Sequence, residues 1–194
     1  AKRWTIPADV VIPVPDTART SAIQFAETLG LKYREGLIKN RYVGRTFIMP
    51  NQNEREKGVS VKLNPIISSI RGKRVILFDD SIVRGTTSKQ IVKLLRKHGA
   101  KEVHFVSTCP PIKHPCYYGI DMPTESELIA GNKTIPEIAE YMDADSLTYA
   151  TLGEIKESLK KETFCAACLT GEYPYPISKA QKQELIVGRQ KFYG

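Results

Sequence analysis

The chain has 194 residues, of which 41% are hydrophobic and 26% are charged, a composition typical of one soluble globular domain with a sizeable core. Its formal net charge of +8 favours polyanionic partners, but the Lys and Arg residues are scattered without interleaved aromatic residues, which argues against nucleic acid. No apolar run reaches the length of a membrane span and residues 1–4 lack the apolar core of a secretory signal, so we expect a cytoplasmic protein without a membrane partner.

Along the chain, strand patterns alternate with amphipathic helical patterns. Strands are expected at 9–14, 33–38, 75–78, 102–107 and 146–150. Helices are expected at 18–29, from Thr86 onward, near 125–130, at 135–142 and at 152–160. The alternation predicts an α/β fold with a parallel sheet covered on both faces. Residues 39–61 are polar, charge-rich and weakly periodic, which predicts a long functional loop.

Residues 74–88 are the most informative segment, because an apolar strand ends in the paired carboxylates of Asp79 and Asp80 and a Gly/Thr-rich turn then opens a helix. The N–H groups of residues 86–88 have no intrahelical partner and lie at the positive end of the helix dipole, which favours a phosphate group. Gly85 allows the backbone to come close. The carboxylates can accept hydrogen bonds from sugar hydroxyls or hold a hydrated Mg²⁺, so the turn is predicted to recognise sugar and phosphate together.

A structural alternative for this segment is a strand-turn-helix corner in which Asp79 or Asp80 merely caps the helix. The complete order, two acids followed by Ser-Ile-Val-Arg-Gly-Thr-Thr-Ser, favours the functional interpretation. It is not a Walker A loop, which would end in Gly-Lys-Ser/Thr.

This order resembles the phosphoribosylpyrophosphate (PRPP) motif of type I phosphoribosyltransferases. Residues 8–17, 39–48, 114–121 and 165–174 extend the resemblance to the phosphoribosyltransferase half of the glutamine PRPP amidotransferases. The resemblance implies an α/β, type I phosphoribosyltransferase fold: a mainly parallel sheet flanked by helices, with a flexible catalytic loop. It also implies a phosphoribosyltransferase domain at 1–160 and a C-terminal CxxC-containing segment, 161–194, packed on it.

The implied reaction displaces pyrophosphate from PRPP with ammonia to give 5-phosphoribosylamine, the first step of de novo purine biosynthesis. In the family an N-terminal glutaminase domain releases the ammonia from glutamine, and we expect that domain to be absent here because Ala1 has no thiol nucleophile. Purine nucleotides as feedback inhibitors and a homo-oligomer are further implications of the resemblance.

The resemblance also assigns site residues. Catalytic roles fall to Asp79, Asp80, Arg41 and Arg45. PRPP contacts are expected from Lys39, Tyr42, Asp79, Asp80, Ser81, Arg84, Gly85, Thr86, Thr87 and Ser88. Mg²⁺ is expected at Thr17, Asp79 and Asp80, since this ion accepts few protein ligands and keeps waters and phosphate oxygens. The alternatives are a helix cap for Thr17 and a solvated basic loop for residues 39–61.

The cysteines leave several alternatives open. Cys165 and Cys168 form a CxxC, and the resemblance adds Cys116 as a third ligand of the 4Fe–4S cluster that some family members hold. The fourth family position is not in this chain, and Cys109 is a spare thiol. Cys109 could substitute, the cluster could be lost, or the thiols could be free, metal-bound or oxidised.

Two other functions would share part of these features. A salvage or pyrimidine phosphoribosyltransferase would keep the PRPP turn but carry a base-recognition hood, and the amidotransferase-type loop argues against it. A non-catalytic regulator would use its basic surface to bind RNA or DNA, and salt-dependent retention on nucleic acid without PRPP turnover would favour it. The intact acid pair and loop favour the enzyme.

Overall fold

The structure is a computed structural model, and it describes residues 1–40, 63–120, 122, 124–161, 163–178, 180 and 182. The predicted site residues Arg41, Tyr42 and Arg45 lie outside the described residues, as does the predicted loop 39–61 beyond Asn40.

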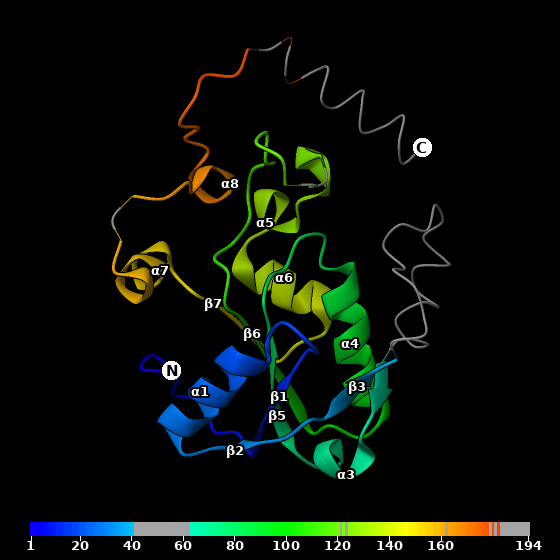
Figure 1. Cartoon of the computed structure of the whole chain (residues 1–194). Helices are drawn as coiled ribbons and strands as arrows, with labels where there is room; N and C mark the ends of the chain where they lie inside the picture. Colours follow the sequence, from blue (N-terminus) through cyan, green and yellow to red (C-terminus); the bar gives the residue numbers. More distant parts are fainter. Residues whose placement is uncertain are drawn as a thin grey trace.

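Within the described residues, a five-stranded parallel sheet forms the centre of the molecule (Figure 1). The strand order is β2-β1-β5-β6-β7, and every neighbouring pair is parallel. The strands are β1 Val10–Pro13, β2 Lys32–Tyr33, β5 Arg74–Asp79, β6 Glu102–Ser107 and β7 Ser146–Tyr149. The predicted α/β fold with a mainly parallel sheet is thus confirmed, and most predicted strand limits lie within one or two residues of these bounds.

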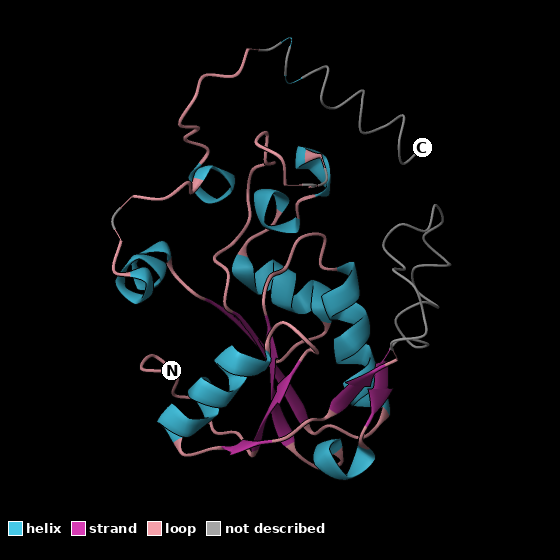
Figure 2. Cartoon of the chain, in the orientation of Figure 1, coloured by secondary structure: helices cyan, strands magenta, loops and turns pink. Residues whose placement is uncertain are grey.

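Helices cover both faces of the sheet (Figure 2). α1 (Arg19–Leu29) packs on one face, whereas α4 (Thr86–Lys97) and α6 (Ile135–Met142) cover the other. Alternate residues of β5 point to opposite sides: Val75 and Leu77 join the core beneath α4, and Ile76 and Phe78 join the core beneath α1. A strand buried on both faces must be apolar throughout, which explains the continuous apolar run in its sequence.

The remaining elements are short. They are β3 Leu37–Lys39, β4 Leu63–Pro65, α3 Ile67–Ile70, η2 Glu125–Glu127, α5 Ile129–Asn132, α7 Leu152–Leu159 and α8 Ala167–Thr170. The elements β4, α3 and α8 were not predicted, because segments of three or four residues carry no measurable periodicity.

Two predicted elements are divided in the structure. The predicted strand 33–38 is two strands, since β3 leaves the main sheet and pairs antiparallel with β4. Gly36 lies at the division, where an added Cβ would overlap the side chain of Ile12. The predicted helix near 125–130 is broken at Leu128, whose backbone is extended at φ −76° and ψ 110°.

The described part of the C-terminal segment contacts the loop that follows β6. The N–H groups of residues 113 and 114 donate to the carbonyl oxygen of Cys168 at 2.9 and 3.0 Å. The Tyr173 hydroxyl donates to the Pro115 carbonyl oxygen at 2.7 Å. The Tyr118 and Tyr173 rings also meet edge to face, with centroids 6.0 Å apart. Hydrogen bonds and aromatic contacts therefore hold this segment to the loop.

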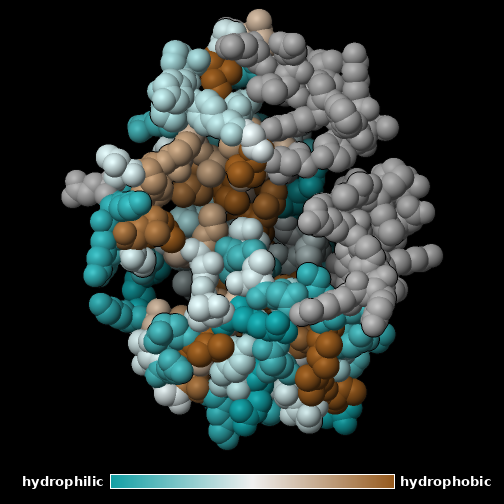
Figure 3. Space-filling model, in the orientation of Figure 1, coloured by the Kyte–Doolittle hydropathy of each residue, from teal (hydrophilic) through white to brown (hydrophobic). Residues whose placement is uncertain are grey.

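The surface is mixed in polarity. On the face drawn in Figure 3, a band of apolar residues separates polar surfaces above and below it. None of the described helices is long and apolar enough to cross a bilayer.

Candidate active site

The predicted residues Thr17 and 79–88 follow the carboxyl ends of β1 and β5, whereas Lys39 ends β3 and the three predicted cysteine ligands lie elsewhere. The sheet order reverses between these neighbours, since β1 is followed by β2 on one side and β5 by β6 on the other. Such a switch point leaves a crevice in which open α/β sheets bind ligands. Pro13 of β1 pairs with Phe78 of β5, so the turn at 15–17 and the acid pair leave the sheet side by side.

The backbone of the acid pair is held by hydrogen bonds from the two residues that follow β6. Asp79 is the last residue of β5, and its carbonyl oxygen accepts from the N–H of Thr108 at 3.1 Å. The carbonyl oxygen of Asp80 accepts from the N–H of Cys109 at 2.9 Å and from the Thr108 hydroxyl at 3.1 Å. The two carboxylates consequently hold a defined position, with Asp79 buried and Asp80 exposed.

The burial of Asp79 changes its acidity. Burial, and then the charge of Asp80, raise the pKa of Asp79 to about 7. The Asp80 N–H, which donates to Asp79 Oδ1 at 2.8 Å, has the opposite effect and lowers it. A cation beside the pair would favour the ionised carboxylate.

The donor atoms of this site fit Mg²⁺. Asp79 and Asp80 offer carboxylate oxygens, and the exposed Thr17 offers a hydroxyl on the neighbouring strand end. Mg²⁺ usually takes one or two carboxylates and completes its shell with water and phosphate oxygens. In the described part of the chain no three His, Cys, Asp or Glu side chains form a metal-holding group.

Neither acid caps the following helix. The N-cap of α4 is Gly85, at φ 74°, and no side chain caps the helix start. The first helical bond runs from the Lys89 N–H to the Gly85 carbonyl oxygen at 2.9 Å, which leaves the N–H groups of residues 86–88 without a described partner. The capping alternative for the acids is therefore wrong, and the free amides with the helix dipole suit a phosphate.

The other turn residues differ in accessibility. Ser81 donates from its hydroxyl to Asp80 Oδ1 at 3.2 Å. Thr86 is half-buried and Thr87 is exposed, whereas Ser88 is buried. Of these three residues only Thr87 is exposed, so the side chains of the helix start differ in what they can offer a ligand.

An ion pair connects the turn at 15–17 to Lys39. Lys39, the last residue of β3, places Nζ 3.6 Å from Asp16 Oδ2. Arg19 lies 2.8 Å from the other Asp16 oxygen and also pairs with Glu35 at 3.1 Å. The sequence analysis gave Asp16 and Arg19 no role, although their i, i+3 spacing at a helix start was a signal for this pair.

Thr17 is not a helix cap. The N-cap of α1 is Ala18, and no side chain caps that helix start. The capping alternative for Thr17 is therefore wrong, and its exposed hydroxyl remains available to a ligand.

The cysteines do not form a cluster site. None of the four cysteines, all of which the structure describes, forms a disulfide. Burial, and then the nearby Cys116 and Cys165, raise the pKa of Cys168, and burial raises the pKa of Cys109 to about 11. Iron needs thiolates, and among the residues that the structure places no three thiols are close enough to hold a metal. The expected 4Fe–4S ligands Cys116, Cys165 and Cys168 therefore do not fit the cluster in this arrangement.

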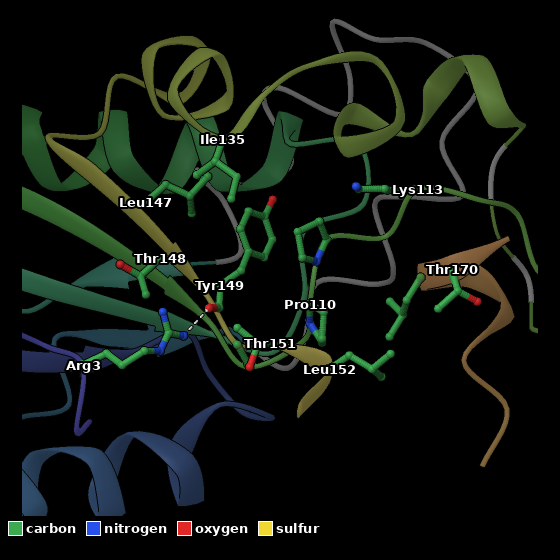
Figure 4. A pocket seen from close by; sticks show the side chains of 13 residues that line it. Arg3, Pro110, Lys113, Ile135, Leu147, Thr148, Tyr149, Thr151, Leu152 and Thr170 are labelled. Atoms are coloured by element: carbon green, nitrogen blue, oxygen red, sulfur yellow. Dashed lines mark hydrogen bonds between the residues drawn. The ribbon is translucent and has the colours of Figure 1, made fainter. Parts of the chain in front are cut away.

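A cavity of about 410 Å³ lies elsewhere, where the end of β7 meets the 110–113 loop and α8 (Figure 4). None of the predicted site residues lines it. Arg3 lies at its rim, but the guanidinium already pairs with Glu154 at 2.8 Å and donates to the Tyr149 carbonyl oxygen at 3.0 Å. The cavity is therefore separate from the site at β1 and β5.

Comparison with known proteins decides the family of this site. A family model described as the phosphoribosyl transferase domain matches residues 5–126. The chain belongs to the phosphoribosyltransferase domain family. The chain is 53% identical over 190 residues to the amidophosphoribosyltransferase of Methanocaldococcus jannaschii, covering 98% of the chain and 40% of that protein. It is 47% identical over 183 residues to the Bacillus subtilis amidophosphoribosyltransferase, covering 91% and 38%.

Solved structures confirm the type I phosphoribosyltransferase fold. The glutamine PRPP amidotransferase of B. subtilis, complexed with ADP and GMP, superposes with a TM-score of 0.80 at 46% identity over 92% of this chain and 40% of that chain. A structure described as the allosteric regulatory enzyme of purine biosynthesis gives 0.82 at 46% identity over 93% and 40%. The chain thus spans about two fifths of the length of the relatives that it matches.

Proposed function

We propose that the chain transfers the phosphoribosyl group of PRPP to ammonia, giving 5-phosphoribosylamine and pyrophosphate. The observation that carries this proposal is the pairing of an uncapped helix start, at α4, with the acid pair in one turn at the sheet's switch point. Relatives named amidophosphoribosyltransferase, at 53% and 47% identity, support ammonia as the acceptor.

In this proposal each part of the substrate has a place. The 5-phosphate accepts from the amides of residues 86–88, and the ribose hydroxyls donate to Asp79 and Asp80. The pyrophosphate lies at the 15–17 turn, where Lys39 supplies positive charge. Mg²⁺ held by Asp79, Asp80 and Thr17 would neutralise charge that develops on the leaving pyrophosphate.

The reaction breaks the bond from C1 to pyrophosphate and forms a bond from C1 to nitrogen. Positive charge builds on the ribose ring as the leaving group departs, as in glycoside hydrolysis, and the acid pair lies where it can stabilise that charge. Ammonia brings its own lone pair and afterwards loses a proton to solvent, so no nucleophile-base pair of side chains is required. Preorganised charge is the main contribution of this chain.

For the longer protein, the same proposal includes ammonia released from glutamine, feedback by purine nucleotides and assembly into a homo-oligomer in the cytoplasm. The greater length of the relatives supports the glutamine-dependent part, and the ADP and GMP complex of the B. subtilis protein supports the nucleotide feedback. A 4Fe–4S cluster on Cys116, Cys165 and Cys168 would need those thiols to move together and a fourth ligand, so no role is proposed for it.

The test is pyrophosphate release from Mg²⁺–PRPP by the purified chain with ammonium. We expect release that requires PRPP, Mg²⁺ and ammonium together. Release that depends instead on a purine or pyrimidine base would replace the proposal with a salvage or pyrimidine phosphoribosyltransferase. Salt-dependent retention on nucleic acid without any release would favour the non-catalytic regulator.

A further inference from the structure

Residues 124–132, which contain η2 and α5, contact the phosphate-binding turn from outside. Three consecutive turn residues, 83–85, each contact it. The contacts are Ile129 N–H to the Val83 carbonyl oxygen at 3.0 Å, Arg84 Nε to Glu127 Oε1 at 2.9 Å, and the Ile129 Cδ1 methyl against Gly85, where an added Cβ would lie 2.6 Å away. A hydrogen bond, an ion pair and a close packing contact therefore meet at the start of α4.

The turn has little to hold its own shape. Its described side chains make two hydrogen bonds within the turn. The Ser81 hydroxyl donates to Asp80 Oδ1, and the Asp80 N–H donates to Asp79 Oδ1. Gly85 adopts φ 74° and loses much conformational freedom when one shape is selected. External contacts must therefore supply the order that the amides of 86–88 need for binding.

The contacting segment is itself well ordered. Glu127 Oε2 accepts from the N–H and hydroxyl of Thr124 at 3.1 and 3.0 Å, which completes a capping box. Asn132 Nδ2 donates to three carbonyl oxygens of the same segment, those of Glu125, Ser126 and Leu128. Burial raises the pKa of Glu127, but hydrogen bonds from Arg84 and Thr124 outweigh this effect, so the net pKa is lowered from its usual value. The carboxylate is therefore ionised at neutral pH.

We propose that Glu127 is a positioning residue for the phosphate-binding turn. Its carboxylate holds Arg84 and, together with Ile129, fixes residues 83–85 in the shape that directs the free amides of α4 at the 5-phosphate. The carboxylate binds Arg84 through Nε, which leaves both Nη groups available to a phosphate oxygen. The inference rests on the proposed function, because the amides must bind a phosphate.

The test compares two ligands, ribose 5-phosphate and pyrophosphate with Mg²⁺, by calorimetric titration of the 194-residue chain. Glu127→Gln keeps the shape of the side chain and removes its charge. Glu125→Gln is the matched control, because Glu125 lies on the same short helix with a side chain that is 69% exposed and 3.7 Å from His114. Because the side chains of Arg84 and Glu127 are 39% and 42% exposed, we expect a moderate effect, about a fivefold rise in the Kd of ribose 5-phosphate for Glu127→Gln.

Binding of pyrophosphate should stay unchanged in both variants, and so should ribose 5-phosphate binding in the control. Adding Glu127→Gln to Arg84→Met should cause no further loss, because Glu127 acts through Arg84. An unchanged Kd in Glu127→Gln, equal weakening of both ligands, or losses that add in the double variant would overturn the inference. If the unsubstituted chain binds neither ribose 5-phosphate nor PRPP, the proposed function itself fails.

Discussion

At the scale of single residues, adjacent acids have unequal surroundings. Asp79 is 7% exposed and its pKa is raised to about 7, whereas Asp80 is exposed. The difference follows from the strand: β5 ends at Asp79, so that side chain still points into the packed sheet, and the next residue already belongs to the turn. The pair therefore combines a carboxyl that needs a cation to ionise fully with one that water already solvates.

Asp79→Asn combined with Asp80→Asn should abolish Mg²⁺-dependent PRPP turnover, with a loss of at least about 10²-fold, because preorganised charge at such a site contributes that much. Turnover is measured as pyrophosphate release, and thermal melting checks that the double variant is folded. Asp143→Asn is the matched control, since Asp143 is 74% exposed at the end of α6 and should keep full activity. Near-normal turnover in a folded double variant would disprove the assignment.

Gly85→Ala should impair both the turn and the reaction. Gly85 and Gly72 both have positive φ, 74° and 71°, so alanine at either site should cost about 1–2 kcal/mol of stability. Only at Gly85 would the new Cβ also press on Ile129, at 2.6 Å, whereas nothing lies within 4 Å at Gly72.

Melting temperature and kcat/KM for PRPP are measured for both glycine variants. We expect both to be destabilised and only Gly85→Ala to lose activity. Equal kcat/KM values in the two variants would show that the shape of the turn at Gly85 does not matter.

At the scale of elements, an ion pair connects the beginning of the chain to α7. Arg3 donates from Nε and Nη2 to the two Glu154 oxygens at 2.8 and 2.9 Å. Glu154 also completes a capping box with Thr151 at the start of the helix. One carboxylate thus serves both the helix start and a contact 151 residues away in sequence.

The stability of this contact should depend on pH. The hydrogen bond from Arg3, and then that from the Thr151 N–H, lower the pKa of Glu154 from 4.5 to about 2. Because the folded pKa is the lower one, the stabilisation is complete above about pH 4.5 and is lost as pH falls toward 2. The pair is about half exposed, so we expect less than about 1 kcal/mol.

Urea unfolding across this pH window measures the effect. The difference in unfolding free energy between the unsubstituted chain and Glu154→Gln should shrink as pH falls. Glu157→Gln, on the exposed side of the same helix, is the matched control variant. A constant difference for Glu154→Gln would exclude the lowered pKa as its cause.

At the scale of the whole molecule, we expect the 194-residue chain to use ammonium but not glutamine as its nitrogen source. The features identified in it concern PRPP, and the chain matches only 40% of the length of the M. jannaschii relative. Phosphoribosylamine formation should rise with pH while the chain stays folded, since ammonia is the conjugate base of ammonium. Glutamate release from glutamine by the purified chain, with contaminating glutaminase excluded, would contradict this prediction.

Much of the fold was predictable because it depends on near neighbours in the chain. The apolar run at 75–78, the two acids and the Gly/Thr-rich turn predict a strand, a turn and a helix, and the structure places β5 and α4 there. A Thr-x-x-Glu signature stands at the start of three helices, at 124–127, 134–137 and 151–154. The second and third open helices α6 and α7, which we predicted at nearly the same bounds, whereas the helix predicted after the first is divided. Local pattern thus determined the class of fold and the place of the Gly/Thr-rich turn.

Only the tertiary structure decided which distant residues meet. Arg84 pairs with Glu127 across 43 residues of sequence, and Lys39 reaches Asp16 because β3 leaves the main sheet at Gly36. Periodicity and caps report the conformation of a few successive residues, whereas these contacts depend on strand order and on close approach between elements. The sequence by itself therefore determined the chemistry of the turn, and the packing of η2 and α5 decided what holds that turn in place.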